Sequence, residues 1–558
     1  MQEQVGSVQR CGAAALPALL LAALLLVPSL FARGLLPPDE ARYADVALAM
    51  RESGEGLVPR LHQQWYSEKP PVFFWAVAAL DRLGVPVAMG PRLVSILSAL
   101  AILALLPVVA RGFGVAQGSA RRGTLVLATL PLFAIYAQLG FIDQLLALEV
   151  TAAAACALER GRIAVARRAA RTGWALAEGL LLALALLTKG PVALLFAAGL
   201  RAGAALARPS DGARVPGRAG ALDLLVLGVA GAVAGAWLLA ASRVAGADYV
   251  WKLTLGQLER RILGSEPKHH VRPGFLAAVV LAGSLPWSVL ALGARVPWSW
   301  RAAVRLPPRL AGLVGWGVLP VACLAAIPTQ QPHYALPSLP PLALLAAELL
   351  SAPIRRGARR AAAAIAVALS AALVAATLWI EHVPGISAFD PEVVRRLAHD
   401  HVLAGVVALA ALTAILAATW RTGQRPPDAP ARAVLGVVAW LAALPVIAWR
   451  ADELMNASSL VTSPALASAP RIVAPTGLRS AVRLATRLPL VEESRGRALE
   501  ELVDSDPALV VIAPRSTLEA SGLLPRVRVV ARGFMRGREM VAVRGPLGSV
   551  AAPAGDGR

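Results

Sequence analysis

Residues 92–110 read RLVSILSALAILALLPVVA, and residues 111–123, which follow directly, read RGFGVAQGSARRG. The first stretch is almost wholly apolar and about 20 residues long, as an α-helix must be to cross a bilayer. The second stretch holds three arginines and no acidic residue. Because basic residues favour the cytoplasmic side of membrane helices, this pair predicts a transmembrane helix that ends in a cytoplasmic loop.

Apolar runs of this kind recur along the chain and predict about thirteen transmembrane helices. The loops 111–123, 160–173, 201–220, 295–309, 351–360 and 421–432 each carry three to five arginines, whereas the short loops 139–142 and 328–332 carry none. This alternation predicts a cytoplasmic N-terminus and places residues after 450 outside. The runs lie near 12–32, 92–110, 124–138, 143–159, 174–188, 190–207, 221–241, 273–294, 309–327, 333–350, 361–380, 402–420 and 432–450.

The composition agrees with a membrane protein. Hydrophobic residues make up 57% of the 558 residues and charged residues 16%, whereas a soluble chain carries about a quarter charged residues. The formal net charge is +21, but the arginines are spread over short loops between apolar runs instead of forming one basic face. We therefore expect the lipid bilayer, and no nucleic acid, as a partner.

The predicted fold is an all-α polytopic membrane domain followed by a small soluble α/β domain. The membrane domain covers residues 1–450, with long outer loops at 33–91 and 242–272. Residues 451–548 are more highly charged and hold short β-like runs at 508–512 and 527–530, with a helical segment before the first. Residues 549–558 are expected to form a disordered tail.

The first outer loop holds the strongest catalytic candidates. It begins PPDEARYAD at Pro37, so Asp39 and Glu40 follow a Pro-Pro pair where a helix is expected to start. Asp39 could cap that helix, and this role does not exclude catalysis. Arg42, one helical turn further on, is expected to pair with the Asp39 carboxylate and is also a candidate contact to the donor phosphate.

Further cations and a second carboxylate are predicted on the same side of the membrane. Lys69 precedes Pro70-Pro71 and an aromatic stretch, so it could anchor the chain at the membrane surface or neutralise a lipid phosphate. Asp143 lies at the outer end of a span, where a carboxylate is costly unless it has a partner. Lys189 stands in a tight break between two apolar runs, either as a hairpin tip in water or as part of the site.

The second long loop and a later segment add candidate phosphate contacts. Arg260 and Arg261 lie on an outer loop, against the topology rule, which favours an anionic partner. His269 is followed by a second histidine, which is weak support for a metal site because no third ligand is near in sequence. Tyr334 could be an interface aromatic or a contact to a lipid phosphate.

These groups fit the transfer of a sugar from a lipid carrier. A polyprenyl phosphate would leave, its charge neutralised by lysine and arginine side chains. Asp39 would act as the general base that deprotonates an acceptor hydroxyl. Glu40 is a catalytic candidate together with Asp39 and Asp143. We expect it to support the first outer loop or the side of the site where the acceptor binds.

The ordered motifs resemble those of the lipid A aminoarabinose transferases and protein O-mannosyltransferases of the GT-C glycosyltransferase superfamily. The carriers, in order from residue 38, are PDEARYA, YSEKPP with Trp75, GPRL, Ile142-Asp143, LTKGP, Arg261-Ile262-Leu263, LPW and PHYALP. The resemblance as a whole covers roughly residues 12–350. The chain departs from the family at TQQ (329–331), where a lysine is often found, and at Ile262, where phenylalanine is usual.

The resemblance implies a thirteen-helix fold in the bacterial inner membrane, an undecaprenyl-phosphate sugar donor and an inverting transfer on the periplasmic face. It implies that Asp39 is essential with Asp143 beside it, that Lys69, Arg261 and Tyr334 contact the carrier phosphate, and that Lys189 lines the cavity. Some members bind a divalent metal, which implies Glu68, His269 and His333 as candidate ligands. The acceptor stays open between lipid, glycan and protein.

Two other classes share some of these features. A transporter or flippase of lipid-linked sugars would have similar spans and charges, but transporters place charges near the membrane midplane in inverted repeats. Here the charges gather at one face, and no repeat is evident. A structural membrane subunit would explain the C-terminal segment but would leave Asp39, Lys69 and Asp143 without a role.

Overall fold

The computed structural model of the chain describes residues 15–36, 38–206, 220–262, 271–295, 306–378, 410, 438, 458–488, 491–494, 499–506, 508–535 and 538–546. The predicted spans 402–420 and 432–450, apart from residues 410 and 438, lie outside the described residues. So do the predicted tail 549–558 and His269.

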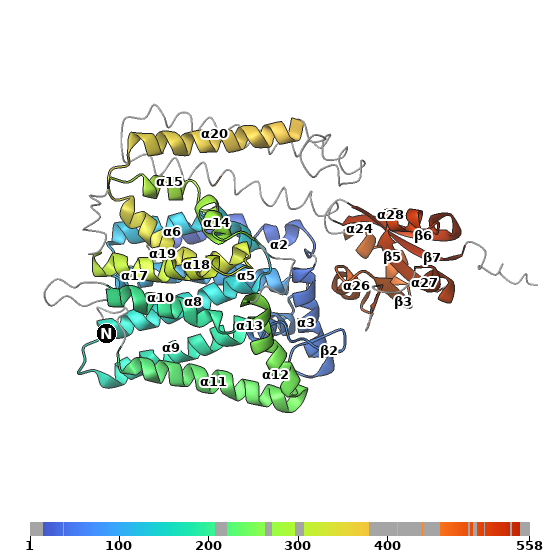
Figure 1. Cartoon of the computed structure of the whole chain (residues 1–558), viewed down its shortest axis with the longest axis horizontal. Helices are drawn as coiled ribbons and strands as arrows, with labels where there is room; N and C mark the ends of the chain where they lie inside the picture. Colours follow the sequence, from blue (N-terminus) through green and yellow to red (C-terminus); the bar gives the residue numbers. More distant parts are fainter. Residues whose placement is uncertain are drawn as a thin grey trace, which may run out of the picture.

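The described part of residues 15–378 is a helical bundle (Figure 1). Five of its described helices are long and apolar enough to cross a membrane, and a sixth span results if a pair bent by 118° counts as one. The pair is α7 (Pro131–Gln138) and α8 (Ile142–Arg162). The five are Ala15–Ala32, which ends in α2 (Ser29–Ala32), α5 (Gly90–Gly112), α9 (Arg168–Lys189), α11 (Leu222–Ala245) and Pro308–Ala325, which comprises α17 (Pro308–Gly317) and α18 (Leu319–Ala325). The total of thirteen stays a prediction.

Three predicted single spans are interrupted, so their prediction as continuous helices was wrong. Residues 124–138 divide between α6 (Gln117–Ala128) and α7, and residues 273–294 between α14 (Phe275–Gly283) and α15 (Trp287–Leu292). Residues 333–350 begin as a 3-10 helix, η2 (Pro332–Ser338), before α19 (Leu339–Leu349). Prolines stand at or just before these second segments, and a proline cannot donate the backbone hydrogen bond that would continue the preceding helix.

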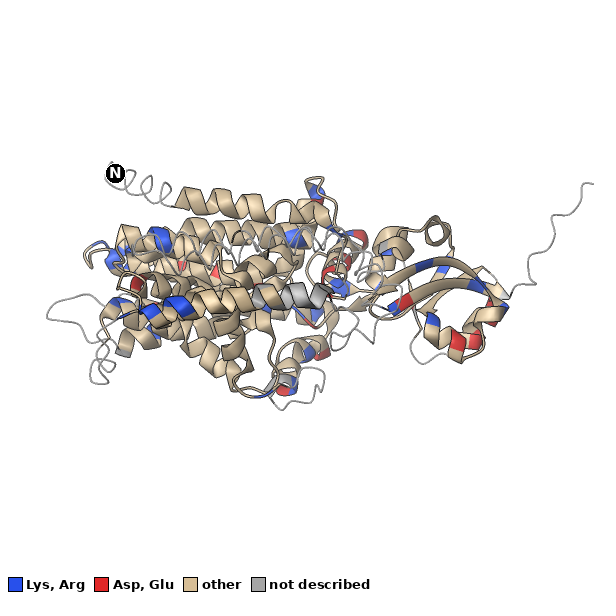
Figure 2. Ribbon diagram, turned by 90° about the horizontal axis from the view of Figure 1, so that it is seen from above, with Lys and Arg blue, Asp and Glu red and all other residues tan. Residues whose placement is uncertain are grey.

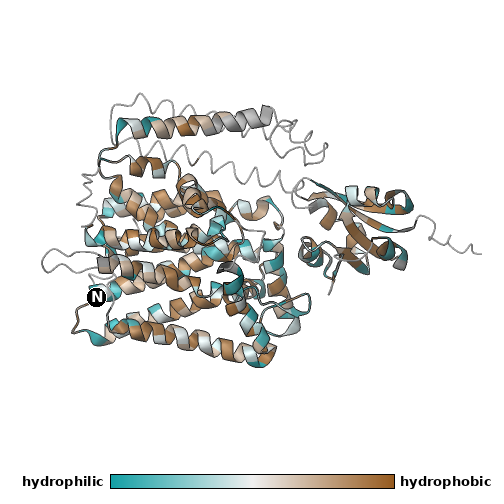
Figure 3. Ribbon diagram, in the orientation of Figure 1, coloured by the Kyte–Doolittle hydropathy of each residue, from teal (hydrophilic) through white to brown (hydrophobic). Residues whose placement is uncertain are grey.

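The remaining bundle helices, α10 (Val192–Leu206) and α20 (Arg356–Leu378), follow the predicted positions. Small residues set the packing of α10 against α17. A methyl group built on Gly203 would lie 2.3 Å from the carbonyl oxygen of Ala311, and one on Gly199 would lie 2.6 Å from that of Gly315. Such close backbone approach is typical of helix pairs in membranes. The hydrophobic effect does not drive helices together there, and small residues allow the van der Waals packing that does. Figure 3 shows the apolar character of the bundle.

The loop end of the bundle, which we define as the end carrying residues 33–91, holds short helices and one hairpin (Figure 1). The first loop forms α3 (Asp39–Ser53), β1 (Arg60–Leu61), β2 (Gln64–Trp65) and α4 (Val72–Arg82). The second forms α12 (Ala247–Leu253) and α13 (Leu255–Ile262). His62 and Gln63 have φ values of 48° and 67°, as a two-residue hairpin turn requires at both central positions.

Residues 458–546 contain a five-stranded mixed sheet in the order β4-β3-β5-β7-β6. β3 pairs in parallel with β4 and β5, whereas β7 pairs antiparallel with β5 and β6. The segments predicted as β lie in β5 and β6. The strands are β3 (Arg471–Ala474), β4 (Glu492–Glu493), β5 (Leu509–Pro514), β6 (Val527–Met535) and β7 (Arg538–Pro546), and the helices are α24 (Ser458–Val461), α25 (Pro464–Ala467), α26 (Arg479–Thr486), α27 (Leu499–Ser505), α28 (Arg515–Ala520) and η5 (Leu524–Arg526).

This C-terminal sheet unit, residues 458–546, lies beside the loop end of the bundle (Figure 1). Figure 2 shows acidic and basic residues mixed between the sheet unit and the bundle, and basic residues at the opposite end of the bundle. The described parts of the predicted inner and outer loops therefore lie at opposite ends of the bundle.

Candidate active site

Asp39 is the first residue of α3, and Pro38 occupies the N-cap position. The predicted capping role of Asp39 was therefore wrong: no side-chain hydrogen bond caps this helix. The Asp39 carboxylate instead forms an ion pair with Arg42, as the spacing predicted. Its side chain is 34% exposed, so it can be reached from the loop end of the bundle.

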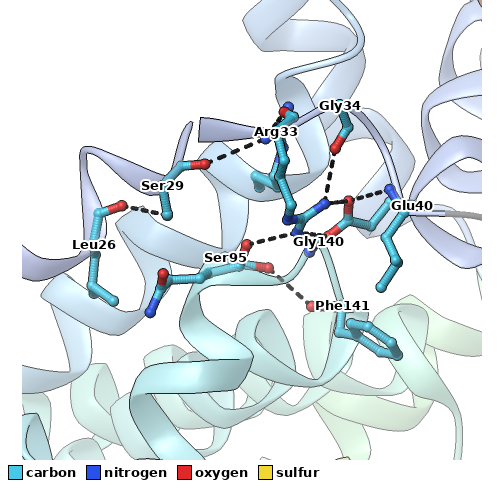
Figure 4. A network of polar contacts seen from close by, with 11 residues as sticks. Leu26, Ser29, Arg33, Gly34, Glu40, Ser95, Gly140 and Phe141 are labelled. Atoms are coloured by element: carbon cyan, nitrogen blue, oxygen red, sulfur yellow. Dashed lines mark hydrogen bonds and ion pairs between the residues drawn. The ribbon is translucent and has the colours of Figure 1, made fainter. Parts of the chain in front are cut away.

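Glu40 has the opposite environment, because its side chain is fully buried. Both Arg33 guanidinium nitrogens donate to it at 2.6 Å, and the backbone N–H groups of Leu36 and Gly140 donate at 2.8 and 2.9 Å (Figure 4). Burial by itself would raise the pKa of Glu40, but the paired Arg33, with Arg92 nearby, lowers it overall. Glu40 thus ties the start of α3 to the turn before α8.

Asp143 and Lys189 form a buried ion pair between the first turn of α8 and the last turn of α9. Both side chains are 5% exposed, so the alternative of Lys189 as a hairpin tip in water was wrong. The His333 Nε2 atom lies 3.7 Å from the other Asp143 oxygen. The Lys189 ammonium lies 4.3 Å from the ring centroid of Tyr334. Lys189 and the His333 imidazole therefore face the two oxygens of this carboxylate, and the Tyr334 ring lies against the Lys189 ammonium.

Asp39 and Asp143 both lie close enough to Tyr43 to influence its phenol electrostatically. Burial raises the pKa of the Tyr43 phenol well above its ordinary value, and the negative charges of Asp39 and Asp143 act in the same direction, whereas the Arg42 cation acts against them. Two groups 104 positions apart in the chain therefore act on one side chain. The Lys69 ammonium also lies close enough to Asp143 to act on it electrostatically.

The second loop is attached to the segment that carries Lys69. The Gln257 side-chain amide, on α13, donates to the carbonyl oxygens of Ser67 and Glu68 at 2.9 and 2.5 Å. Lys69 itself donates to the Glu68 carbonyl at 3.0 Å. Arg260 lies half-buried on α13, one turn after Gln257, and the side chain of Arg261 is not among those described.

The metal hypothesis is not supported by the described residues. Among them, no three or more His, Cys, Asp and Glu side chains gather as they would to hold a metal ion. His333 contacts Asp143, and Glu68 is exposed near Lys69. His269 lies outside the described residues, so its proposed role as a ligand stays a prediction.

Several polar contacts could not be predicted from the sequence because their partners lie on elements that are distant in the chain. Arg33, Gln257 and Arg483 are examples. At the opposite end of the bundle, Arg160 and Arg201 each pair with both Glu178 and Asp223. An acidic residue inside an apolar run, such as Glu178, is a signal that a partner must exist, but the sequence does not name it.

Comparisons with known proteins show what this chain is similar to. The sequence pattern of the family described as dolichyl-phosphate-mannose-protein mannosyltransferase matches residues 14–209. The fold is that of ArnT from Cupriavidus metallidurans, whose crystal structure bound to undecaprenyl phosphate aligns with a TM-score of 0.70 at 21% identity. That alignment covers 96% of this chain and 98% of ArnT. The chain therefore shares the fold of ArnT.

Two curated relatives show a more specific sequence similarity. The chain is 26% identical over 339 residues to undecaprenyl phosphate-alpha-4-amino-4-deoxy-L-arabinose arabinosyl transferase 2 of Proteus mirabilis, covering 59% of each chain. It is 30% identical over 335 residues to the undecaprenyl phosphate-alpha-4-amino-4-deoxy-L-arabinose arabinosyl transferase of Pseudomonas paraeruginosa. This alignment covers 59% of this chain and 58% of the relative. The alignments thus span a little under three fifths of these relatives. Together with the family match, they confirm the predicted resemblance to the aminoarabinose transferases and the protein mannosyltransferases.

Proposed function

We propose that this chain is an integral-membrane glycosyltransferase that transfers a sugar from undecaprenyl phosphate to a lipid, glycan or protein acceptor. The transfer takes place on the periplasmic face of the bacterial inner membrane and inverts the configuration of the anomeric carbon. Asp39 is the general base. The names of the curated relatives and the fold of ArnT support this class of reaction.

The observation that carries the proposal is the arrangement of charges at the loop end. Asp39 is a partly exposed carboxylate paired with Arg42, whereas Asp143 is a buried carboxylate paired with Lys189 and approached by His333. A general base must be reachable by its substrate, whereas a phosphate needs cations held in place. An accessible base and a buried group of fixed charges are the two elements that sugar transfer from a lipid phosphate requires.

The proposed step has a simple balance. An acceptor hydroxyl gives its proton to the Asp39 carboxylate, and the acceptor oxygen forms a new bond to the anomeric carbon. The bond between that carbon and the phosphate oxygen breaks, and its electron pair stays on undecaprenyl phosphate. The candidates that neutralise the charge of this leaving group are Lys69, Arg260, Arg261, Lys189 and Arg42, and the Tyr334 hydroxyl is a candidate hydrogen-bond donor to the phosphate.

The transfer assay that tests this function uses the full-length chain in lipid nanodiscs with undecaprenyl-phosphate-linked sugars. We expect a new glycosidic product and free undecaprenyl phosphate, and mass spectrometry of envelope lipids and glycans with and without the intact gene identifies the acceptor. A flippase of lipid-linked sugars would instead move the donor across the bilayer and form no new bond. Donor movement without a product would therefore overturn the proposal.

Lys69→Ala is expected to weaken binding of the donor carrier. A hydrogen bond to a charged group is worth about 1.5–3 kcal/mol, which corresponds to roughly a tenfold to hundredfold loss of affinity. The measurement is titration of undecaprenyl phosphate into the full-length chain in nanodiscs.

The matched control for this prediction is Lys252→Ala. Lys252 lies on α12, is 52% exposed and pairs with Asp248 four residues before it. Exposed pairs of this kind contribute little, so the control should bind the carrier like the wild type. Equal affinity of the Lys69 variant and the control would return Lys69 to a role as a membrane-surface anchor.

A further inference from the structure

The C-terminal sheet unit shares an apolar core with the first outer loop. Ala41, on α3, is buried within the hydrophobic cluster formed by residues of the sheet unit such as Leu466 and Val482. In the other direction, Leu484 of α26 packs against the cluster of the first loop that contains Tyr43 and Phe73. α3 and α26 are therefore in direct contact, although they lie far apart in the sequence.

A buried ion pair lies in this interface. The Arg483 guanidinium of α26 pairs with Asp45 of α3, and the two side chains are 6% and 0% exposed. Arg483 also donates to Glu52 at 2.5 Å. Burial raises the pKa of the Asp45 carboxyl, and the charge of Arg483 is the largest influence in the opposite direction. Removing Arg483 would leave Asp45 buried without its main counter-charge.

The contacts occupy one side of α3. Ala41, Asp45 and Glu52 are spaced i, i+4 and i+11, so they share one face of the helix. Asp39 and Tyr43, spaced i and i+4, lie on a different face, because two residues along an α-helix turn the side chain to nearly the opposite side. The sheet unit therefore holds α3 from the side opposite to the carboxylate at its start.

We propose that Arg483 is a positioning residue for sugar transfer: through Asp45 and Glu52 it holds α3 so that Asp39 meets the acceptor hydroxyl. The inference rests on the proposed function, and it gives the C-terminal unit a part in catalysis without contact to the substrate. The ordering of catalytic groups tolerates little displacement, and an error of about 1 Å can cost about a hundredfold in rate.

The experiment compares the full-length wild type with Arg483→Gln in nanodiscs, using two readouts. Hydrogen–deuterium exchange of residues 39–53, measured without donor, should rise about tenfold or more as α3 loosens. Sugar transfer should lose about a hundredfold in kcat, while the KM for the lipid-linked donor changes little. A purely structural role elsewhere in the sheet unit would not single out α3.

Three further variants sharpen the result. Arg483→Lys keeps the charge next to Asp45 and should restore most of the rate. Asp45→Asn combined with Arg483→Gln should cost no more than the worse single change, because paired residues act as a unit. Arg471→Gln is the matched control, since Arg471 is 54% exposed and pairs with Glu492 and Asp506 inside the sheet unit.

The outcomes separate the two proposals. Unchanged exchange of α3 in Arg483→Gln, or loosened α3 with an unchanged kcat, overturns the positioning role. If Arg483→Gln fails to fold, Asp45→Asn, which keeps the shape of the side chain, takes its place with the same expected results. A wild type that transfers no sugar overturns the proposed function, whereas the exchange rates still decide whether Arg483 holds α3.

Discussion

Asp39→Asn is expected to lower sugar transfer by about a hundredfold to ten-thousandfold while the protein stays inserted and folded. The amide keeps the size of the side chain but cannot accept the proton of the acceptor hydroxyl, and general base catalysis typically contributes that factor. Folding should survive because the Asp39 side chain is 34% exposed and its ion pair with Arg42 spans a single helical turn. The measurement is the initial rate of transfer from an undecaprenyl-phosphate-linked sugar in nanodiscs.

Asp248→Asn is the matched control for this change. Asp248 lies on α12 in the second outer loop, and its side chain is 74% exposed. The same substitution there removes a carboxylate at the loop end without touching the site, so the rate should stay at the wild-type level. A wild-type rate in Asp39→Asn would remove Asp39 from the role of base.

Lys189→Met is expected to destabilise the folded protein by about 3–5 kcal/mol, the cost of removing one partner from a buried ion pair. The reason is that Asp143, 5% exposed, would lose the ammonium that pairs with it. The His333 imidazole, 3.7 Å from the other carboxylate oxygen, is a weaker replacement because it carries charge only when protonated. The measurement is unfolding of the protein in detergent micelles, and the loss of the monodisperse folded species is the signal that is recorded.

Two controls test whether this loss belongs to the pair. Lys252→Met makes the same substitution in an exposed pair and should cost no more than about 0.5 kcal/mol. Asp143→Leu together with Lys189→Met removes both charges, so it should recover most of the stability while transfer stays absent. A Lys189→Met protein as stable as the Lys252→Met control would show that Asp143 does not depend on Lys189.

The membrane fold and most site candidates could be predicted from the sequence because they follow from local properties. A run of about 20 apolar residues must lie in a bilayer or a large core, and arginine-rich loops mark one side of it. An acidic residue at the end of such a run is costly by itself, which singled out Asp143 before any partner was known. Asp39 and Arg42 could be paired in advance because they are one helical turn apart.

The helix breaks and the long-range partners could not be predicted in this way. A proline inside an apolar run is compatible with a kinked helix or with two separate helices, and only the neighbouring helices decide between them. Residues 124–138 and 273–294 were therefore predicted as single spans, but each contains two helices. In the same way, Asp39 was expected to cap α3, but Pro38 takes that position.

By itself, the sequence determined that this chain builds an apolar helical bundle with chemistry-bearing residues at one end, because hydrophobic length and charge cost are local quantities. Only the tertiary structure decided which of the two acids after Pro38 is accessible: Asp39 faces outward, and Glu40 is enclosed by Arg33. It also brought Lys189 to Asp143 over 46 positions, and Arg483 to Asp45 over 438. The physical reason is that a buried charge requires a partner, and the packing of elements distant in the sequence determines which residue that partner is.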